Sequence, residues 1–163
     1  MDNNKISKMA MLLSFSVVLS LIESFIPLFS SVPGIKLGLA NIVIIFVIYK
    51  YSLKDALYIS ILRVILIGIL RTGLFSISFF FSLVGALFSI FTMYILKSSK
   101  LSIVGVSIGG SISHSIGQIL VAIIFLNNIN IIYYLPILLI SSIITGFIIG
   151  ILGMKLINYY EYL

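Results

Sequence analysis

The chain has 163 residues, of which 61% are hydrophobic and 9% are charged, and its mean hydropathy is +1.32. A soluble domain would carry about 25% charged residues, so this composition excludes an ordinary soluble globular protein and indicates an integral membrane domain. The formal net charge of +6 does not indicate nucleic-acid binding, because the basic residues stand at segment ends without interleaved aromatics. Cysteine is absent, which excludes disulfides, thiolate nucleophiles and cysteine metal sites.

Six apolar segments follow one another along the chain, separated by charged and turn-forming residues. Each is expected to be a helix, because a lipid-exposed backbone needs internal hydrogen-bond partners and the segments lack the alternation of barrel strands. The predicted fold is therefore all-α, a single-domain bundle of six transmembrane helices. Its predicted helices are 9–29, 37–49, 56–70, 74–96, 103–125 and 134–157, within one domain over 1–163 that has short tails at 1–8 and 158–163. The second and third are expected to extend into their flanks, since a span needs about 20 residues.

The lysines are distributed unequally between the two ends of this bundle. One end collects Lys5, Lys8, Lys50, Lys54, Lys97, Lys100 and Lys155. The other end has only Lys36 and Arg71. Cytoplasmic loops carry the excess of Lys and Arg, so both termini are expected to be cytoplasmic.

The first segment contains a carboxylate, Glu23, in apolar surroundings. An acid at membrane depth costs at least a few kcal/mol unless it faces a partner or a wet cavity. Glu23 is therefore a candidate site residue.

The connection to the second segment combines a turn signal with polar groups. Pro33 and Gly34 predict a tight turn, and Lys36 and Asn41 follow where the second helix begins. Free backbone N–H groups beside a cation suit an anionic or carbonyl-bearing ligand. An ordinary Pro-Gly turn with a snorkelling Lys36 is the alternative.

The third segment places Arg63 near the predicted midplane of the membrane. One interpretation is a buried ion pair with Glu23 that specifies how two helices dock. In the other, both side chains face one cavity, with Arg63 available to a ligand anion and Glu23 to an amine, imide or hydroxyl. Both interpretations stay open at this point.

The fifth segment carries a polar stripe. Ser107, Ser111, His114 and Gln118 follow spacings of four, three and four, which place them on one helix face. Gly105 and Gly109 form a Gly-x-x-x-Gly pair suited to close helix packing. A metal site is not expected, because a lone His has no second ligand at helical spacing. Alternatively, these residues only pack helices.

The polar residues of four predicted helices can converge on one pocket that opens outward. The predicted substrate-binding residues are Glu23, Lys36, Asn41, Arg63, His114 and Gln118.

Several of these motifs together resemble a known family, the Gx transporter family, often labelled heptaprenyl diphosphate synthase component I in bacterial genomes. The strings that carry the resemblance are Glu23-Ser24, Val32-Pro33-Gly34, Lys36-Leu37-Gly38-Leu39-Ala40-Asn41, Leu62-Arg63-Val64, Ser113-His114 and Gly117-Gln118. The family is similar to the substrate-binding S components of energy-coupling factor transporters. The resemblance implies a bacterial plasma-membrane protein that binds a vitamin-like or cofactor-precursor molecule under its first loop.

The same resemblance implies protein partners. Small residues of the first helix dock a transmembrane coupling subunit in such S components, and here they correspond to Ala10, Ser14, Ser16 and Ser20. The chain has no nucleotide-binding loop of the Gly-x-x-x-x-Gly-Lys-Ser/Thr type, so partner ATPases would supply hydrolysis.

Prenyl diphosphate chemistry by this chain is not expected. Such synthases hold Mg²⁺ with clustered aspartates, whereas Asp2 and Asp55 are isolated. We expect no enzyme activity and no cofactor. The alternative function is a non-catalytic membrane accessory subunit linked to polyprenyl diphosphate and quinone biosynthesis or electron transfer.

Overall fold

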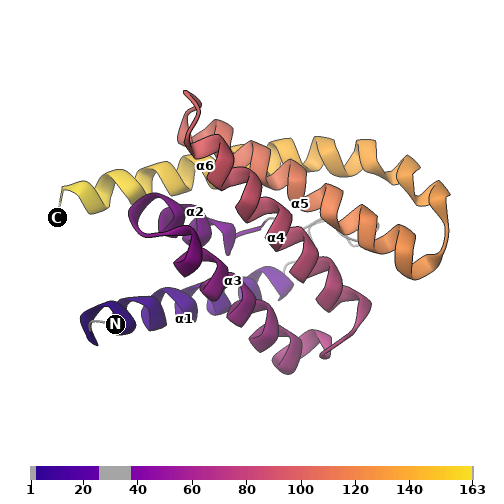
Figure 1. Ribbon diagram of the computed structural model, residues 1–163, viewed down its shortest axis with the longest axis horizontal. Coiled ribbons are helices and arrows are strands. Elements are labelled where there is room, and N and C mark those ends of the chain that lie inside the picture. Colours follow the sequence, from indigo (N-terminus) through magenta and orange to yellow (C-terminus); the bar gives the residue numbers. More distant parts are fainter. Residues whose placement is uncertain (1–2, 26–37, 163) are drawn as a thin grey trace.

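The structure is a computed structural model that describes residues 3–25 and 38–162. Within these ranges the chain is all-α, with six α-helices and no strand, which confirms the predicted class (Figure 1). The helices are α1 (Asn3–Phe25), α2 (Asn41–Lys50), α3 (Leu53–Ile67), α4 (Ile77–Lys97), α5 (Ile103–Leu126) and α6 (Leu135–Glu161). A π-helical turn, η1 (Gly68–Thr72), follows α3, and a 3-10 helix, η2 (Ile129–Tyr134), precedes α6. Helix α1 begins at Asn3, so most of the expected tail at 1–8 is helical.

Four of the helical segments are long and apolar enough to cross a membrane, namely α1, α4, α5 and the continuous segment Ile129–Glu161. The protein is therefore a membrane protein. The expectation that all six helices reach spanning length is not met by α2, which has 10 residues and is about 15 Å long at 1.5 Å per residue. Helix α3 has 15 residues and is extended by the five residues of η1.

Helix α2 starts later than predicted because a turn interrupts the chain before it. Gly38 has a left-handed φ of +73°, and its carbonyl accepts a hydrogen bond from the Asn41 N–H at 2.8 Å. Asn41 is consequently the first residue of α2 and does not lie inside the helix.

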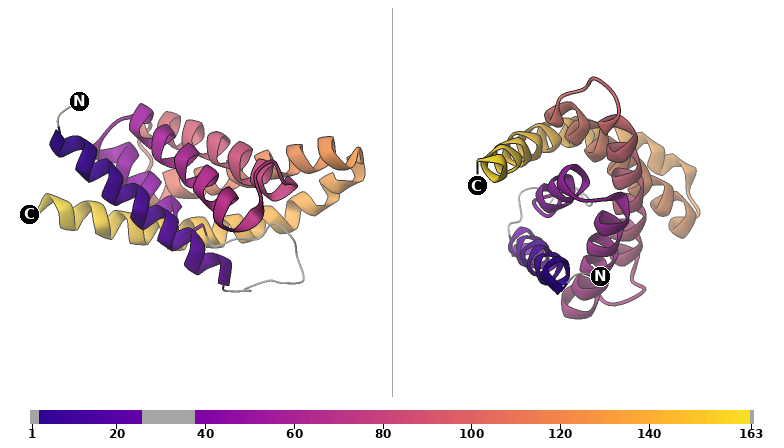
Figure 2. Two further views of the ribbon diagram at one scale, coloured as in Figure 1. Left: turned by 90° about the horizontal axis from the view of Figure 1, so that it is seen from below. Right: turned by 60° about the vertical axis from the view of Figure 1, so that its left-hand side comes forward.

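Helix α2 forms the centre of the bundle. Its residues from Val43 to Ile48 are each at most 5% exposed, and they join the core cluster with Ile90 of α4, Val106 of α5 and Ile157 of α6. The right-hand view of Figure 2 shows α2 between α1 and α6. A short helix that is apolar on every side is expected to be buried in protein, and this one is.

Serine caps fix where three of the helices begin. The hydroxyls of Ser52, Ser76 and Ser102 accept hydrogen bonds from the backbone N–H three residues later, at the starts of α3, α4 and α5. Each cap satisfies one of the four backbone donors that a helix leaves open at its start.

Glycines allow α4 and α5 to approach closely. A Cβ atom added at Gly117 would lie 3.0 Å from the Gly85 Cα, so the two backbones touch there. In the predicted Gly105 and Gly109 pair, only Gly109 faces α4, where an added Cβ would clash with Leu96. The nearest atoms to Gly105 belong to its own preceding turn, so Gly105 makes no close interhelical contact.

Helix α6 approaches α5 in the same way. A Cβ added at Gly146 would lie 2.8 Å from the Ile108 Cα, and one added at Gly150 would lie 2.7 Å from the Val104 Cα. Gly146 and Gly150 thus form a small-x-x-x-small surface. Membrane helices associate through close packing at such surfaces, because lipid supplies no hydrophobic force between helices.

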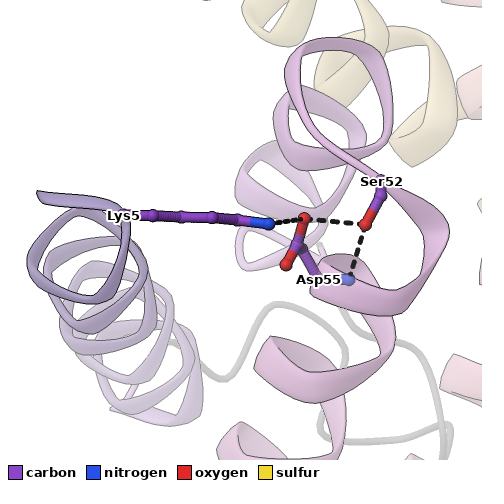
Figure 3. Close-up of polar contacts among 3 residues, drawn as sticks. All are labelled: Lys5, Ser52 and Asp55. Carbon is purple, nitrogen blue, oxygen red and sulfur yellow. Dashed lines mark hydrogen bonds and ion pairs between the residues drawn. The ribbon is translucent and has the colours of Figure 1, made fainter. Parts of the chain in front are cut away.

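Lysines gather at one end of the bundle, which also holds both ends of the described chain (Figures 1 and 2). We call this the terminus end. There Lys5 Nζ lies 2.9 Å from the Asp55 carboxylate, to which the Ser52 hydroxyl also donates at 2.7 Å (Figure 3). Lys97 donates to the Ile48 carbonyl at 2.7 Å, and Lys50 pairs with Glu161. The predicted clustering of lysines at one end is confirmed, while its cytoplasmic side remains a prediction.

Candidate functional site

A cavity of about 340 Å³ lies in the half of the bundle away from the terminus end. It is formed by the last turns of α1 and α3, the middle of α5 and the first turns of α2, α4 and α6, and it lies beyond the start of the short helix α2. Its described lining residues are Ser20, Glu23, Ser24, Gly38, Ala40, Asn41, Arg63, Val64, Ile67, Arg71, Thr72, Ser78, Phe79, Ser82, Ser111, His114, Ser115, Gln118, Ser141, Ser142 and Thr145. We call it the polar cavity.

The structure brings five of the six predicted binding residues together around this cavity. Glu23, Asn41, Arg63, His114 and Gln118 all line it. The sixth, Lys36, lies outside the described residues. Polar groups far apart in the sequence therefore share one space, as their predicted depths indicated.

The Glu23 carboxylate binds the turn that precedes α2. Its two oxygens accept hydrogen bonds from the backbone N–H groups of Gly38, at 2.6 Å, and Leu39, at 3.0 Å. Hydrogen bonds to an ionised acceptor are about twice as strong as neutral ones. Glu23 therefore fixes the start of α2 against the end of α1, a contact that the sequence did not reveal.

Arg63 is a buried cation in the wall of the cavity. It is 7% exposed, and within the described residues no carboxylate oxygen lies within 4.0 Å of its guanidinium, since the ion pairs found there are Lys5–Asp55 and Lys50–Glu161. The charge of Glu23 still acts on it electrostatically. The sequence left open an ion pair or a shared cavity. In the structure Glu23 and Arg63 line one cavity and form no direct ion pair.

The polar stripe of α5 is divided by the structure. Ser111, His114 and Gln118 line the cavity, whereas Ser107 is 3% exposed and lies nearer the terminus end, away from it. The His114 ring rests on Gly85 of α4, because a Cβ added there would lie 2.8 Å from the ring Nε2. Gly85 is thus a site residue that the sequence analysis missed.

Hydroxyl groups of α6 form a second wall that was also missed. Ser141, Ser142 and Thr145 line the cavity, and the Ser142 hydroxyl lies 2.5 Å from that of Ser115 on α5. A usable signal was present, because Ser142 stands four residues before Gly146 and continues the small-residue surface of α6.

Arg71 of η1 also lines the cavity. Its guanidinium lies 5.1 Å from the centroid of the Phe25 ring, at the far end of α1. From the sequence, Arg71 indicated only the topology of the chain.

The four predicted docking residues of α1 do not share one surface. Ala10 and Ser14 are exposed, but Ser16 is 0% exposed. Ser20 lines the cavity and donates to the Ser16 carbonyl at 3.0 Å. Ser16 is buried and Ser20 faces the cavity within the bundle, and docking of a partner on α1 stays a prediction.

The described residues contain no group of three or more His, Cys, Asp or Glu side chains that could hold a metal ion. The ionisable groups of the cavity are instead spread over α1, α3, η1 and α5. This arrangement can bind polar and charged groups of a small molecule by hydrogen bonds.

The fold and the cavity define a helical membrane protein with a polar cavity between its helices. Residues 12–156 match the family described as heptaprenyl diphosphate synthase component I, and the chain belongs to that family. No curated protein and no solved structure matches the chain.

Proposed function

We propose that the protein is the membrane-embedded substrate-binding component of a small-molecule uptake transporter. The observation that supports this most directly is the convergence of five polar side chains, predicted from the sequence, on one cavity of about 340 Å³. Small-molecule sites in proteins have volumes of about 300–1,000 Å³. Polar side chains at membrane depth are costly, and they are kept where a substrate or water meets them.

In this proposal the cavity opens away from the cytoplasm and accepts a vitamin-like or cofactor-precursor molecule. Glu23, Lys36, Asn41, Arg63, His114 and Gln118 contact the ligand. A transmembrane coupling subunit and partner ATPases provide the energy for transport, with the exposed Ala10 and Ser14 of α1 as the docking surface. The lipid bilayer is the other partner, and nucleic acid is not one.

Family membership favours a second candidate. The family description names a component of heptaprenyl diphosphate synthase, so the protein is alternatively a non-catalytic membrane subunit of polyprenyl diphosphate and quinone biosynthesis or of electron transfer. It would then have a stable protein partner and no small ligand of its own.

Native mass spectrometry of the detergent-purified protein tests the proposal. A defined small molecule should co-purify with the wild type and be lost from Arg63→Gln. Lys54→Gln is the matched control, because it removes a cation from an exposed position of the same helix. A ligand-free mass with co-purifying protein subunits would support the second candidate instead.

A further inference from the structure

The two arginines of the chain are set apart from its lysines by position. Arg63 and Arg71 both line the polar cavity, whereas no lysine in the described part of the chain does so. The guanidinium is a planar fork of donors that matches the two oxygens of a carboxylate or phosphate group, while an ammonium is a point charge. Within the described residues, the arginines therefore lie at the cavity, and the lysines lie away from it.

Arg63 is also available to an anion. Its side chain is buried, with 7% of the residue exposed. No hydrogen bond or ion pair is found between its guanidinium and any described residue. Glu23 is the acid that lines the same cavity, and its two carboxylate oxygens accept hydrogen bonds from the backbone N–H groups of Gly38 and Leu39. A buried cation is costly unless an anion or a hydrogen-bond acceptor meets it, and a ligand anion in the cavity would do so.

The rest of the wall is suited to a hydrophilic molecule. Apolar side chains in the described lining are limited to Ala40, Val64, Ile67 and Phe79, and hydroxyl groups dominate the remainder. Several of these hydroxyls, including those of Ser20, Ser82 and Thr145, donate to backbone carbonyls of their own helix, so the charged and amide side chains carry the recognition of a ligand's polar groups.

The charges of the wall set the charge of the ligand. Glu23, Arg63 and Arg71 are the acidic and strongly basic side chains among the described lining residues. Two cations and one anion leave a single positive charge. An anionic group on the ligand therefore complements the described wall, and Lys36, which the proposed function also gives to the ligand, adds a cation to the site.

We infer that the polar cavity takes a small polar anion whose carboxylate or phosphate group binds the Arg63 guanidinium, with Arg71 as the second cation of the described wall. This inference rests on the proposed function, which it deepens by naming the chemical class of the substrate. We expect a long isoprenoid chain to bind there less well than a small polar anion.

Arginine-specific modification tests the inference on the full chain. In an Arg71→Lys variant, Arg63 is the remaining arginine, so phenylglyoxal adducts assigned to Arg63 by peptide mapping report on this side chain. The probes are three ion-exchange fractions of a bacterial cell extract, namely anionic, neutral and cationic, together with farnesyl diphosphate. We expect the anionic fraction to slow modification by about tenfold, as near-saturating occupancy would, while the other three probes leave the rate unchanged.

Other results would overturn the inference in distinguishable ways. Protection by the neutral or cationic fraction would leave a binding protein with a ligand of another class. Protection by farnesyl diphosphate would show that an isoprenoid enters the cavity. Absence of protection by every probe, together with a ligand-free native mass, would remove the proposed function as well, and an Arg63 that does not react at all would show that it does not face the cavity.

A conservative variant separates recognition from folding. Arg63→Lys keeps the charge but not the fork, and we expect it to bind the protecting anionic fraction about tenfold more weakly or worse. Its thermal unfolding should stay near that of the wild type. Binding of the anionic fraction is compared between the two proteins as the shift in thermal unfolding temperature that it causes. Equal shifts for the wild type and Arg63→Lys would contradict bidentate recognition by Arg63.

Discussion

At the scale of single residues, the acid that made the sequence informative has two tasks. Glu23 lines the cavity, and it also accepts two backbone N–H groups from the turn before α2. The sequence predicted the first task from the cost of an acid at membrane depth. It did not predict the second, because hydrogen bonds to backbone N–H groups leave no residue-type signal at Gly38 and Leu39.

Glu23→Gln should therefore destabilise the folded protein as well as weaken ligand binding. The amide keeps one acceptor oxygen and presents an NH₂ group to the other backbone donor, which loses its partner. We expect a loss of about 1–3 kcal/mol in unfolding free energy, measured by thermal unfolding in detergent. Glu161→Gln is the control, because its ion pair with Lys50 is exposed and such pairs contribute about 1 kcal/mol or less. Equal effects of the two variants would contradict the role given to Glu23.

Gly85→Ala should disturb the site through packing. The added Cβ would lie 2.8 Å from the His114 Nε2, and the Gly85 backbone already touches Gly117. Overpacking of this kind costs about 1–3 kcal/mol, and the displaced His114 ring should weaken ligand binding in native mass spectrometry.

Gly105→Ala is the matched control on the neighbouring helix. An added Cβ there meets nothing nearer than Leu101 at 3.5 Å, and alanine is the better helix former by about 1 kcal/mol. We expect unchanged or higher stability and unchanged ligand binding. A destabilised Gly105→Ala beside a neutral Gly85→Ala would show that the helices pack differently from the structure.

At the scale of elements, the sequence predicted the long helices well and the short ones poorly. The fifth segment, expected at 103–125, is observed as Ile103–Leu126, because its Ser102 cap and the following Asn127 mark both ends. The second was expected from 37 but begins at Asn41. Hydropathy counts apolar residues and does not register the backbone turn at Gly38, so a half-length buried helix looked like a span.

The docking of α1 on α3 depends in part on one polar contact at the terminus end. Lys5 of α1 donates to Asp55 of α3, which also accepts from Ser52 (Figure 3). Burial alone would raise the pKa of Asp55, but the hydrogen bonds from Ser52 and Lys5 and the charge of Lys5 together lower it. The folded state therefore favours the ionised carboxylate.

This contact predicts a pH dependence of stability. A depressed folded pKa contributes stability above the unfolded value, near the ordinary 3.8, and that stability is lost as the pH falls through the folded pKa. Asp55→Asn should be less stable than the wild type by about 1–2 kcal/mol at pH 7, and the gap should close on acidification below pH 3.8. Thermal unfolding as a function of pH measures this, and a gap that stays constant down to low pH would refute it.

At the scale of the whole molecule, lysine placement and polar depth gave complementary predictions. The lysines predicted which helix ends lie together, and the structure confirms this with Lys5, Lys50 and Lys97 at the terminus end. Depth predicted that the site residues lie in the other half, where the cavity is found. The hydroxyl wall of α6 was not predicted, because serines and threonines in a membrane helix bond their own backbone as readily as they face a cavity.

The side of the membrane on which the cavity opens can be measured directly, because the chain has no cysteine. Single cysteines at Ser99, between α4 and α5, and at Asn128, between α5 and α6, both stand at exposed positions on opposite ends of the bundle. If the lysine-rich end is cytoplasmic, a membrane-impermeant maleimide should label Asn128→Cys in intact cells and Ser99→Cys only after permeabilisation. The reverse pattern would place the cavity on the cytoplasmic side, where a substrate would be released or delivered internally and uptake from outside would be untenable.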